Sequence, residues 1–370
     1  AGRAVAPDEA LLAEYIAEMS RTSRFSNYGP LHEALRDVLQ RSLLADRVCL
    51  FSSATAALVT ALRALDVSGE VITTPFTFAA TPHAITWAGA QPVFADIDRA
   101  ALTLDPARVE AAITPRTTAI VAVHIYGMAC DVAALEDIAA RHRLHLVFDA
   151  AHAFGTCING TPVHRWGDAS VYSTHASKLF HTGEGGVLVC RDDVIAQRAE
   201  RLQNFGLDTD GVPAEAGVNS KMSEIQAALG LSVLPNVAAE RAARRLLAQA
   251  YLQSLSSIAG LKAFVLPAHV EHSLQYFAVR VSGAATRDGP TRRDATLNLL
   301  ASHNIHARRY FYPLCSEFPH YRTLPSAQRG NLPNALSAAE EMLCLPFHGG
   351  VSVAAQSAIA KLLGLLDKLT

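Results

Sequence analysis

The stretch ASVYSTHASKLFHTGEGGVLVC, residues 169–190, sets a polar run with a single lysine between two apolar segments. The segments at 169–174 and 185–190 are rich in β-branched residues and indicate strands. Their connection, about ten residues, is too short for a crossover helix, so the two strands are predicted to be antiparallel neighbours. Lys178 lies in this connection. A lone lysine is more often a solvated surface residue, but here the chain returns directly to a core strand, and we expect the amine to be partly desolvated.

Upstream of this stretch, short apolar runs alternate with helical patterns. The helical segments, such as 55–65 and 131–143, have apolar residues spaced three and four apart, which favours crossover helices and a mainly parallel sheet. The sequence therefore predicts an α/β fold with a mainly parallel, seven-stranded sheet flanked by helices. Ligands of such sheets bind beyond the carboxyl ends of the strands. The seven predicted strands are 47–53, 70–75, 91–97, 118–127, 144–151, 169–174 and 185–190.

Beyond residue 221 the α/β alternation stops. Helical patterns at 221–231 and 237–255 are followed by predicted strands within 262–282 and at 305–313, and the tail at 354–369 is predicted to be a helix. We expect a large ligand-binding domain over 1–240 and a smaller C-terminal α+β domain over 241–370. The N-terminal segment is expected to pack on the small domain.

The composition gives no support for several classes of function. Lys+Arg (32) nearly equals Asp+Glu (34), with a net charge of -2, which gives no electrostatic case for nucleic acid or an anionic membrane. No apolar run approaches the roughly 18 residues of a membrane span, and no signal-peptide pattern opens the chain, so a cytoplasmic protein is expected. The six cysteines lie far apart without a CxxC pair, which indicates reduced thiols and no metal site.

Two strand ends carry residues suited to chemistry. Asp149 ends the apolar strand LHLVF, where a carboxylate is costly unless it meets a cation or several donors; capping the next turn is the alternative. Ser173, His175 and Lys178 follow a later strand at the same edge. A desolvated lysine has a larger neutral fraction and attacks carbonyls, as a Schiff-base lysine must.

Together these residues match the needs of pyridoxal phosphate. This cofactor requires an amine for its aldehyde, an acid beside its ring nitrogen and donors for its phosphate. Lys178 and Asp149 supply the first two. The turn at Ala54 and Thr55 opens a predicted helix and offers a phosphate seat, although an ordinary helix cap is the simpler interpretation. Phe76 or Phe78 is expected to cover the ring and the other to belong to the core.

On these residues the chain resembles the DegT/DnrJ/StrS sugar aminotransferases, which have the fold type I of pyridoxal-phosphate enzymes. The resemblance implies that Lys178 binds the cofactor covalently, Asp149 pairs with the ring nitrogen and His152 lies near the ring hydroxyl. It also implies that Ala54, Thr55 and Ser173 hold the phosphate, that Phe78 stacks on the ring, and that Asn219 reaches the phosphate of the other subunit of a homodimer. Related sugar dehydratases carry His at the lysine position, so Lys178 favours amino transfer. The matching segments are 25–35, 54–58, 73–98, 147–155, 173–186, 217–231, 308–314 and 345–350.

The same resemblance implies a substrate class. It implies that an amino group passes from L-glutamate to a nucleotide-linked keto-deoxysugar. The resemblance is strongest to enzymes for which that sugar is dTDP-4-keto-6-deoxyglucose, aminated at carbon 4. Arg308, Arg309, Tyr310 and Tyr312 could meet the diphosphate or sugar, since guanidinium groups suit phosphate oxygens; solvated charges are the competing interpretation.

The sequence alone leaves other functions open. A carbon-3 ketosugar aminotransferase and a non-catalytic sugar-binding protein on the same fold both remain alternatives. A Rossmann dehydrogenase is disfavoured, because no G-x-G-x-x-G follows an early strand.

Overall fold

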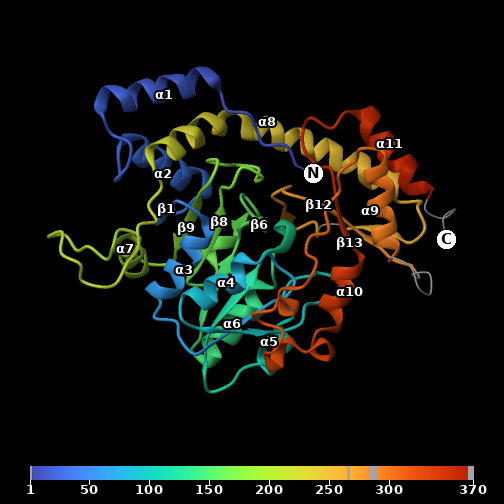
Figure 1. Cartoon of the computed structure of the whole chain (residues 1–370), viewed down its shortest axis with the longest axis horizontal. Helices are drawn as coiled ribbons and strands as arrows, with labels where there is room; N and C mark the ends of the chain where they lie inside the picture. Colours follow the sequence, from blue (N-terminus) through green and yellow to red (C-terminus); the bar gives the residue numbers. More distant parts are fainter. Residues whose placement is uncertain (1, 265–266, 284–290, 366–370) are drawn as a thin grey trace.

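A seven-stranded sheet forms the centre of the chain in the computed structural model, which describes residues 2–264, 267–283 and 291–365 (Figure 1). Its strand order is β1-β9-β8-β5-β4-β2-β3. Four neighbouring pairs, from β3 across to β8, are parallel, whereas β9 is antiparallel to both β8 and β1. This confirms the predicted mainly parallel sheet and the antiparallel pair around the lysine loop. The strands are β1 (Val48–Phe51), β2 (Glu70–Thr73), β3 (Gln91–Phe94), β4 (Thr117–Val123), β5 (His145–Asp149), β8 (Ala169–Ser173) and β9 (Gly186–Cys190).

Helices cover both faces of this sheet, because its strands are apolar on both sides. The helices α3, α4 and α7 share one core cluster with the sheet. On the other face, α5 and α6 pack at one end, and α1, α2 and α8 pack at the other. The helices are α1 (Glu9–Thr22), α2 (Pro30–Leu43), α3 (Ala54–Ala64), α4 (Ala80–Trp87), α5 (Pro106–Ala111), α6 (Val132–His142), α7 (Asp193–Leu202) and α8 (Glu224–Leu255).

The 32-residue helix α8 is shared between the two parts of the chain. Ser223 and Gln226 begin it with a capping box. Its first half buries Ala227 and Leu231 against the large sheet, and its second half buries Tyr251 in the core of the C-terminal part. The division predicted at residue 240 therefore falls inside a continuous helix and stays a prediction.

The C-terminal part is built on a smaller antiparallel sheet with the order β10-β12-β13. The predicted strands within 262–282 and most of the predicted final helix are found, the last residues of that helix lying outside the described ranges. The elements are β10 (Leu261–Ala263), β12 (Phe277–Val281), β13 (Met342–Leu345), α9 (Arg292–Ser302), α10 (Pro333–Glu341) and α11 (Val353–Gly364). A further small sheet joins β11 (Val270–Glu271) to β6 (Cys157–Ile158) and β7 (Thr161–Pro162).

The prediction of a strand at 305–313 was wrong. This segment makes only an isolated bridge between Arg308 and Cys344, because β13 occupies the place beside β12. Its apolar residues pack in a core cluster instead: the Phe311 ring contacts the rings of Phe76 and Tyr126. The run MLCL that forms β13 was not predicted, since four apolar residues alone do not distinguish a strand from a helix.

The N-terminal segment lies along α8 and over the lysine loop. The Asp8 N–H donates to Ser232 O at 2.7 Å, and the amide of Asn236 donates to Ala6 O at 3.0 Å. His181 Nε2 contacts Val5 O at 2.8 Å. Packing of this segment on the small domain therefore stays a prediction, since these contacts reach the first half of α8 and the lysine loop.

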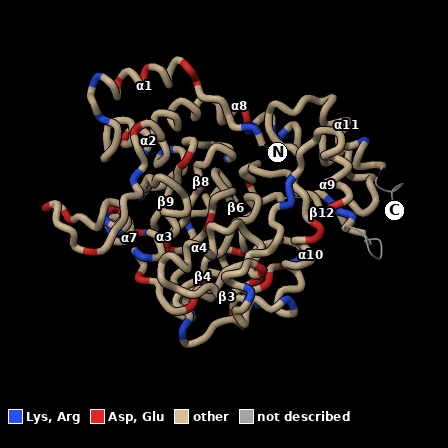
Figure 2. The backbone as a smooth tube through the Cα atoms, in the orientation of Figure 1, with Lys and Arg blue, Asp and Glu red and all other residues tan. Residues whose placement is uncertain are grey.

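Charges of both signs are interspersed along the backbone (Figure 2). All six cysteines are free thiols, and five of them are buried. Within the described ranges, no helix combines the length and the apolar character that crossing a bilayer requires.

Candidate active site

Three chain segments meet at the carboxyl edge of the large sheet. The parallel neighbours β5 and β8 end at Asp149 and Ser173, and β1 is followed by the start of α3 at Ala54. A cavity of about 290 Å³ opens there. Eight of the predicted site residues line it: Ala54, Thr55, Phe78, Asp149, His152, Ser173, Lys178 and Tyr310.

Asp149 is a buried carboxylate that borders this cavity. It accepts hydrogen bonds from the Thr81 hydroxyl at 2.7 Å and from the Ala151 N–H at 3.1 Å. Burial raises the pKa of Asp149, while these two bonds and the charge of Lys178 oppose the rise. Two donors leave part of the carboxylate's acceptor capacity unused. The site thus fits a positively charged N–H donor, which would stabilise the ionised form.

Lys178 is half-buried and borders the same cavity. Its own N–H donates to His175 O at 2.8 Å, which folds the loop into a tight turn. Burial lowers the pKa of the Lys178 amine to about 8, against the opposing attraction of Asp149. The amine also lies 5.9 Å from the centre of the Tyr276 ring. A substantial fraction of this amine is therefore neutral near pH 8, as a nucleophile toward carbonyl groups must be.

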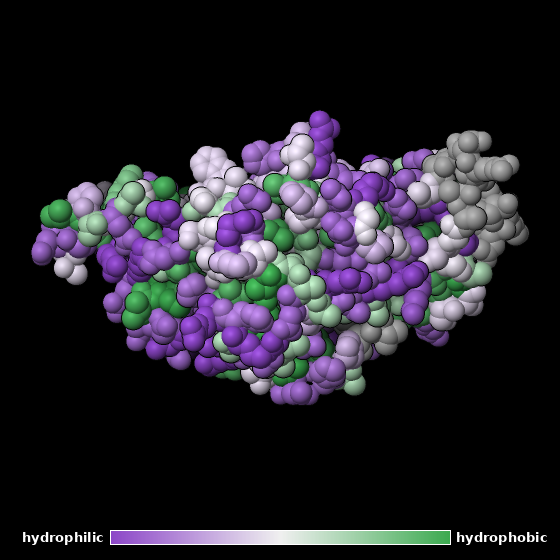
Figure 3. Space-filling view, turned by 90° about the horizontal axis from the view of Figure 1, so that it is seen from below, coloured by the Kyte–Doolittle hydropathy of each residue, from purple (hydrophilic) through white to green (hydrophobic). Residues whose placement is uncertain are grey.

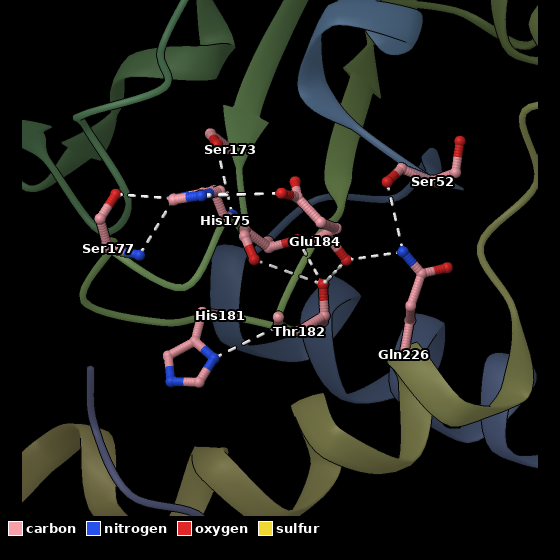
Figure 4. Close-up of polar contacts among 10 residues, drawn as sticks. Ser52, Ser173, His175, Ser177, His181, Thr182, Glu184 and Gln226 are labelled. Atoms are coloured by element: carbon pink, nitrogen blue, oxygen red, sulfur yellow. Dashed lines mark hydrogen bonds and ion pairs between the residues drawn. The ribbon is translucent and has the colours of Figure 1, made fainter.

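Short polar contacts frame the lysine loop (Figure 4). The Ser177 N–H donates to His175 Nδ1 at 3.1 Å, and the Ser177 hydroxyl lies 2.8 Å from the same atom. The His175 N–H donates to Ser173 Oγ at 3.3 Å. Thr174 and Thr182 join the two ends of the loop through their hydroxyls at 2.8 Å. The loop is thus fixed locally by its own side chains.

The glycine pair that closes the loop is required by close packing. A Cβ on Gly186 would lie 2.6 Å from both the N and the Cα of Ala54, at the turn that begins α3. Without side chains, β9 approaches this turn directly. The lysine loop and the start of α3 are therefore held against each other.

The start of α3 presents an anion seat to the cavity. Ser53 is the N-cap, and its hydroxyl accepts from the Ala56 N–H at 3.2 Å. Ala54 and Thr55, which follow it, line the cavity at the helix N-terminus, where unpaired N–H groups favour anions. The turn is thus both a helix cap and a suitable seat for a phosphate.

His152 and a group of aromatic rings form another wall. The His152 Nδ1 accepts from the Tyr126 N–H at 3.3 Å, which leaves Nε2 to carry the proton. Burial lowers the pKa of His152 well below its usual value, so the ring is neutral. It stacks on Phe311 with centroids 5.8 Å apart and meets Tyr276 edge-on at 5.1 Å.

Of Phe76 and Phe78, only Phe78 belongs to the wall of the cavity. Phe76 is fully buried in a core cluster, whereas Phe78 is 61% exposed and lines the cavity. This agrees with the expectation that one of the two belongs to the core. Phe78 is therefore the ring available for stacking on a ligand.

Four predicted site residues do not line this cavity. The side-chain oxygen Oδ1 of Asn219 accepts from Lys221 Nζ at 2.9 Å, outside the cavity. Arg309 donates to Asp294 at 3.4 Å and lies 4.9 Å from the Tyr312 ring. Arg308 borders a second cavity of about 130 Å³.

The second cavity adjoins the first. Ser177, Tyr276 and Tyr310 line both cavities. Within the described residues, the Arg308 guanidinium has no ion-pair partner. The two neighbouring arginines thus have different surroundings, and Arg308 is the one beside the site.

Sequence reasoning missed Thr81, Tyr276 and Phe311. Thr81 contacts Asp149 from within the first turn of α4, which carries no distinctive pattern. Tyr276 and Phe311 reach the site from the C-terminal part, more than 120 residues beyond Asp149. No sequence signal links such distant segments without a structure.

The chain matches the DegT/DnrJ/EryC1/StrS aminotransferase family over residues 8–363. It is 40% identical over 338 residues to the dTDP-4-amino-4,6-dideoxy-D-glucose transaminase of Shigella dysenteriae, covering 91% of this chain and 90% of the relative. It is 37% identical over 361 residues to the Escherichia coli transaminase of the same name, covering 96% and 95%. The crystal structure of DesI in the presence of its TDP-sugar product matches with a TM-score of 0.92 and 36% identity, covering 98% of this chain and 91% of DesI. The expected fold type is thereby confirmed, and the chain belongs to the DegT/DnrJ/EryC1/StrS aminotransferase family.

Proposed function

We propose that this chain is a pyridoxal-phosphate-dependent aminotransferase that moves an amino group from L-glutamate to carbon 4 of dTDP-4-keto-6-deoxyglucose. One observation carries the proposal: the Lys178 amine and the Asp149 carboxylate face one cavity that also receives the N-terminus of α3. The names of the Shigella and Escherichia coli relatives support the choice of sugar and carbon.

The residues around the cavity fit the cofactor. Pyridoxal phosphate supplies an aldehyde that binds amines and a ring that stabilises negative charge on the adjacent substrate carbon. Lys178 would hold the aldehyde, and Asp149, with acceptor capacity to spare, would pair with the ring nitrogen. Thr55, the Ala54 N–H and Ser173 would hold the phosphate, Phe78 would cover the ring, and the His152 Nε2 proton would face the ring hydroxyl.

Lys178 has a second task in this proposal. An amine with a pKa of about 8 can both accept and return a proton at physiological pH. It would remove the proton from the α-carbon of glutamate and later deliver one to carbon 4 of the sugar. Burial and the charge of Lys178 keep the pKa of His152 well below its usual value, so this ring would not compete for that proton.

For the nucleotide-linked sugar, we assign Arg308, Tyr310 and Tyr312 to contacts with the sugar or diphosphate. Arg309 belongs to the predicted set as well, but its pairing with Asp294 and Tyr312 makes Arg308 the stronger candidate for phosphate.

A homodimer is part of the proposal, with Asn219 reaching the phosphate in the partner's site. Exposed apolar side chains support it: Phe205, Val212, Val218 and Ile225 are each at least half exposed. They lie on or next to the segment that projects beyond α7 in Figure 1, and Figure 3 shows apolar patches between hydrophilic ones on the face it displays. Clustered exposed apolar residues are typical of protein interfaces.

The test is incubation of the purified, cofactor-loaded protein with glutamate and either the 4-keto or the 3-keto dTDP-sugar. Mass spectrometry and NMR of the product would identify the aminated carbon. We expect a 4-amino-4,6-dideoxyglucose nucleotide. Exclusive conversion of the 3-keto sugar would refute the proposed carbon, and sugar binding without conversion would indicate a non-catalytic protein.

A further inference from the structure

We propose that Gln275 is a positioning residue for Lys178, an inference that rests on the proposed function of that lysine. The Leu179 N–H donates to Gln275 Oε1 at 2.8 Å, and Gln275 Nε2 donates to Ser177 O at 2.9 Å. These two groups belong to the peptide bonds on either side of Lys178. A single amide side chain therefore holds the lysine's backbone from both directions.

The amide chemistry suits this task. The Leu179 N–H needs an acceptor and the Ser177 carbonyl needs a donor, and a glutamine amide offers one of each in fixed geometry. The same requirement fixes which end of the amide faces which peptide group. Gln275 is only 5% exposed, so water has little access to replace the contacts if the side chain is lost.

Gln275 is itself tied to the opposite wall of the site. Its N–H donates to Ser273 Oγ at 3.3 Å, and the Ser273 hydroxyl donates to His152 O at 2.6 Å. The segment 272–276 therefore contacts the backbone of both the His152 turn and the lysine loop.

A further arginine anchors the start of this segment. Arg241, on α8, donates to His272 O at 2.9 Å and to Gly155 O at 2.8 Å. The segment belongs in sequence to the C-terminal part of the chain, yet it sets the relative position of two segments from the large sheet. We infer that it keeps the Lys178 amine in its desolvated place beside Asp149.

The experiment uses Gln275→Met, which keeps the length and removes both hydrogen bonds. Gln275→Asn is a second variant, which keeps the amide but shortens the reach, in case the first fails to fold. Gln356→Met is the matched control, because Gln356 on α11 is similarly buried, at 6% exposed. Its amide donates to Ala250 O at 3.3 Å and to Ser254 Oγ at 2.7 Å, away from the cavity.

The deciding measurement is the pH dependence of the rate at which formaldehyde and cyanoborohydride methylate Lys178 in the full-length, cofactor-free chain, followed by peptide mass spectrometry. In wild type and in Gln356→Met we expect a midpoint near 8. In the Gln275 variants the loosened amine gains water, and we expect the midpoint to rise by about one pH unit, a roughly tenfold smaller neutral fraction at pH 7.

A midpoint in both Gln275 variants equal to that of Gln356→Met would overturn the inference. Cofactor retention gives a second readout: pyridoxal phosphate, followed by absorbance after dilution, should leave Gln275→Met several times faster than the control. Because the methylation assay contains neither cofactor nor sugar, it tests Gln275 even if the proposed substrates are wrong.

Discussion

Lys178 should weaken the fold that holds it, so replacing it should stabilise the protein. Burial lowers the pKa of this amine from 10.5 to about 8. The folded protein therefore binds the proton less tightly than the unfolded chain, by about 2.5 pH units, or about 3 kcal/mol at roughly 1.4 kcal/mol per unit. Below pH 8 the amine is protonated in both states and the full cost applies. Between pH 8 and 10.5 the cost disappears, because the folded state has already lost the proton.

Lys178→Met removes the charge and keeps an unbranched apolar chain of similar length. We expect the cofactor-free variant to have a free energy of unfolding about 3 kcal/mol larger than wild type at pH 7, with the difference shrinking toward zero by pH 10.5. Urea unfolding at a fixed protein concentration measures it, since association would otherwise shift the apparent stability. Lys361→Met, at an exposed position on α11, is the control and should change little. Equal stability of Lys178→Met and wild type at pH 7, or a difference that does not vary with pH, would refute the buried charge.

Three further predictions concern the site. Asp149→Asn should lower the transamination rate by several orders of magnitude while the fold survives, because an amide cannot keep the ring nitrogen protonated; a normal steady-state rate would mean that Asp149 is only a turn cap. Gly186→Ala should weaken pyridoxal phosphate binding while the protein still folds, since the added Cβ would lie 2.6 Å from the Ala54 backbone; unchanged affinity in a cofactor titration would exclude that turn as the phosphate seat. Arg308→Gln should raise KM for the nucleotide-linked sugar about tenfold or more, as loss of a charged contact does, whereas Arg309→Gln should have a small effect; the reverse order would reassign the phosphate contact.

The positions of site residues could be predicted from the sequence where a polar residue stands at the end of an apolar strand. Asp149 and Ser173 end parallel neighbours, so their proximity followed from the strand pattern alone. The lysine loop was equally predictable, because its length permitted only an antiparallel return. These inferences needed no knowledge of packing between distant segments.

The remaining parts of the site depend on packing that no local pattern records. Gln275 and Tyr276 follow an unremarkable run and gain their roles only because the C-terminal part folds back over the lysine loop. The segment at 305–313 has strand-like composition, yet its apolar residues fill an aromatic cluster and β13 takes the sheet position. Arg308 and Arg309 are adjacent in sequence but have different neighbours, which their spacing could not predict.

The continuity of α8 constrains how the two parts of the molecule can move. A rod of 32 residues, roughly 48 Å long at about 1.5 Å per residue, has no flexible joint between the halves that it serves. Closure over a substrate would therefore require either that the elements packed on α8 shift along its surface, or that α8 itself bends. Pro235 lacks the N–H that would bond one turn back, which makes its turn the weakest point for such bending. Bending at this turn would shift the C-terminal part, which packs on the second half of α8, relative to α1 and α2, which pack on its first half.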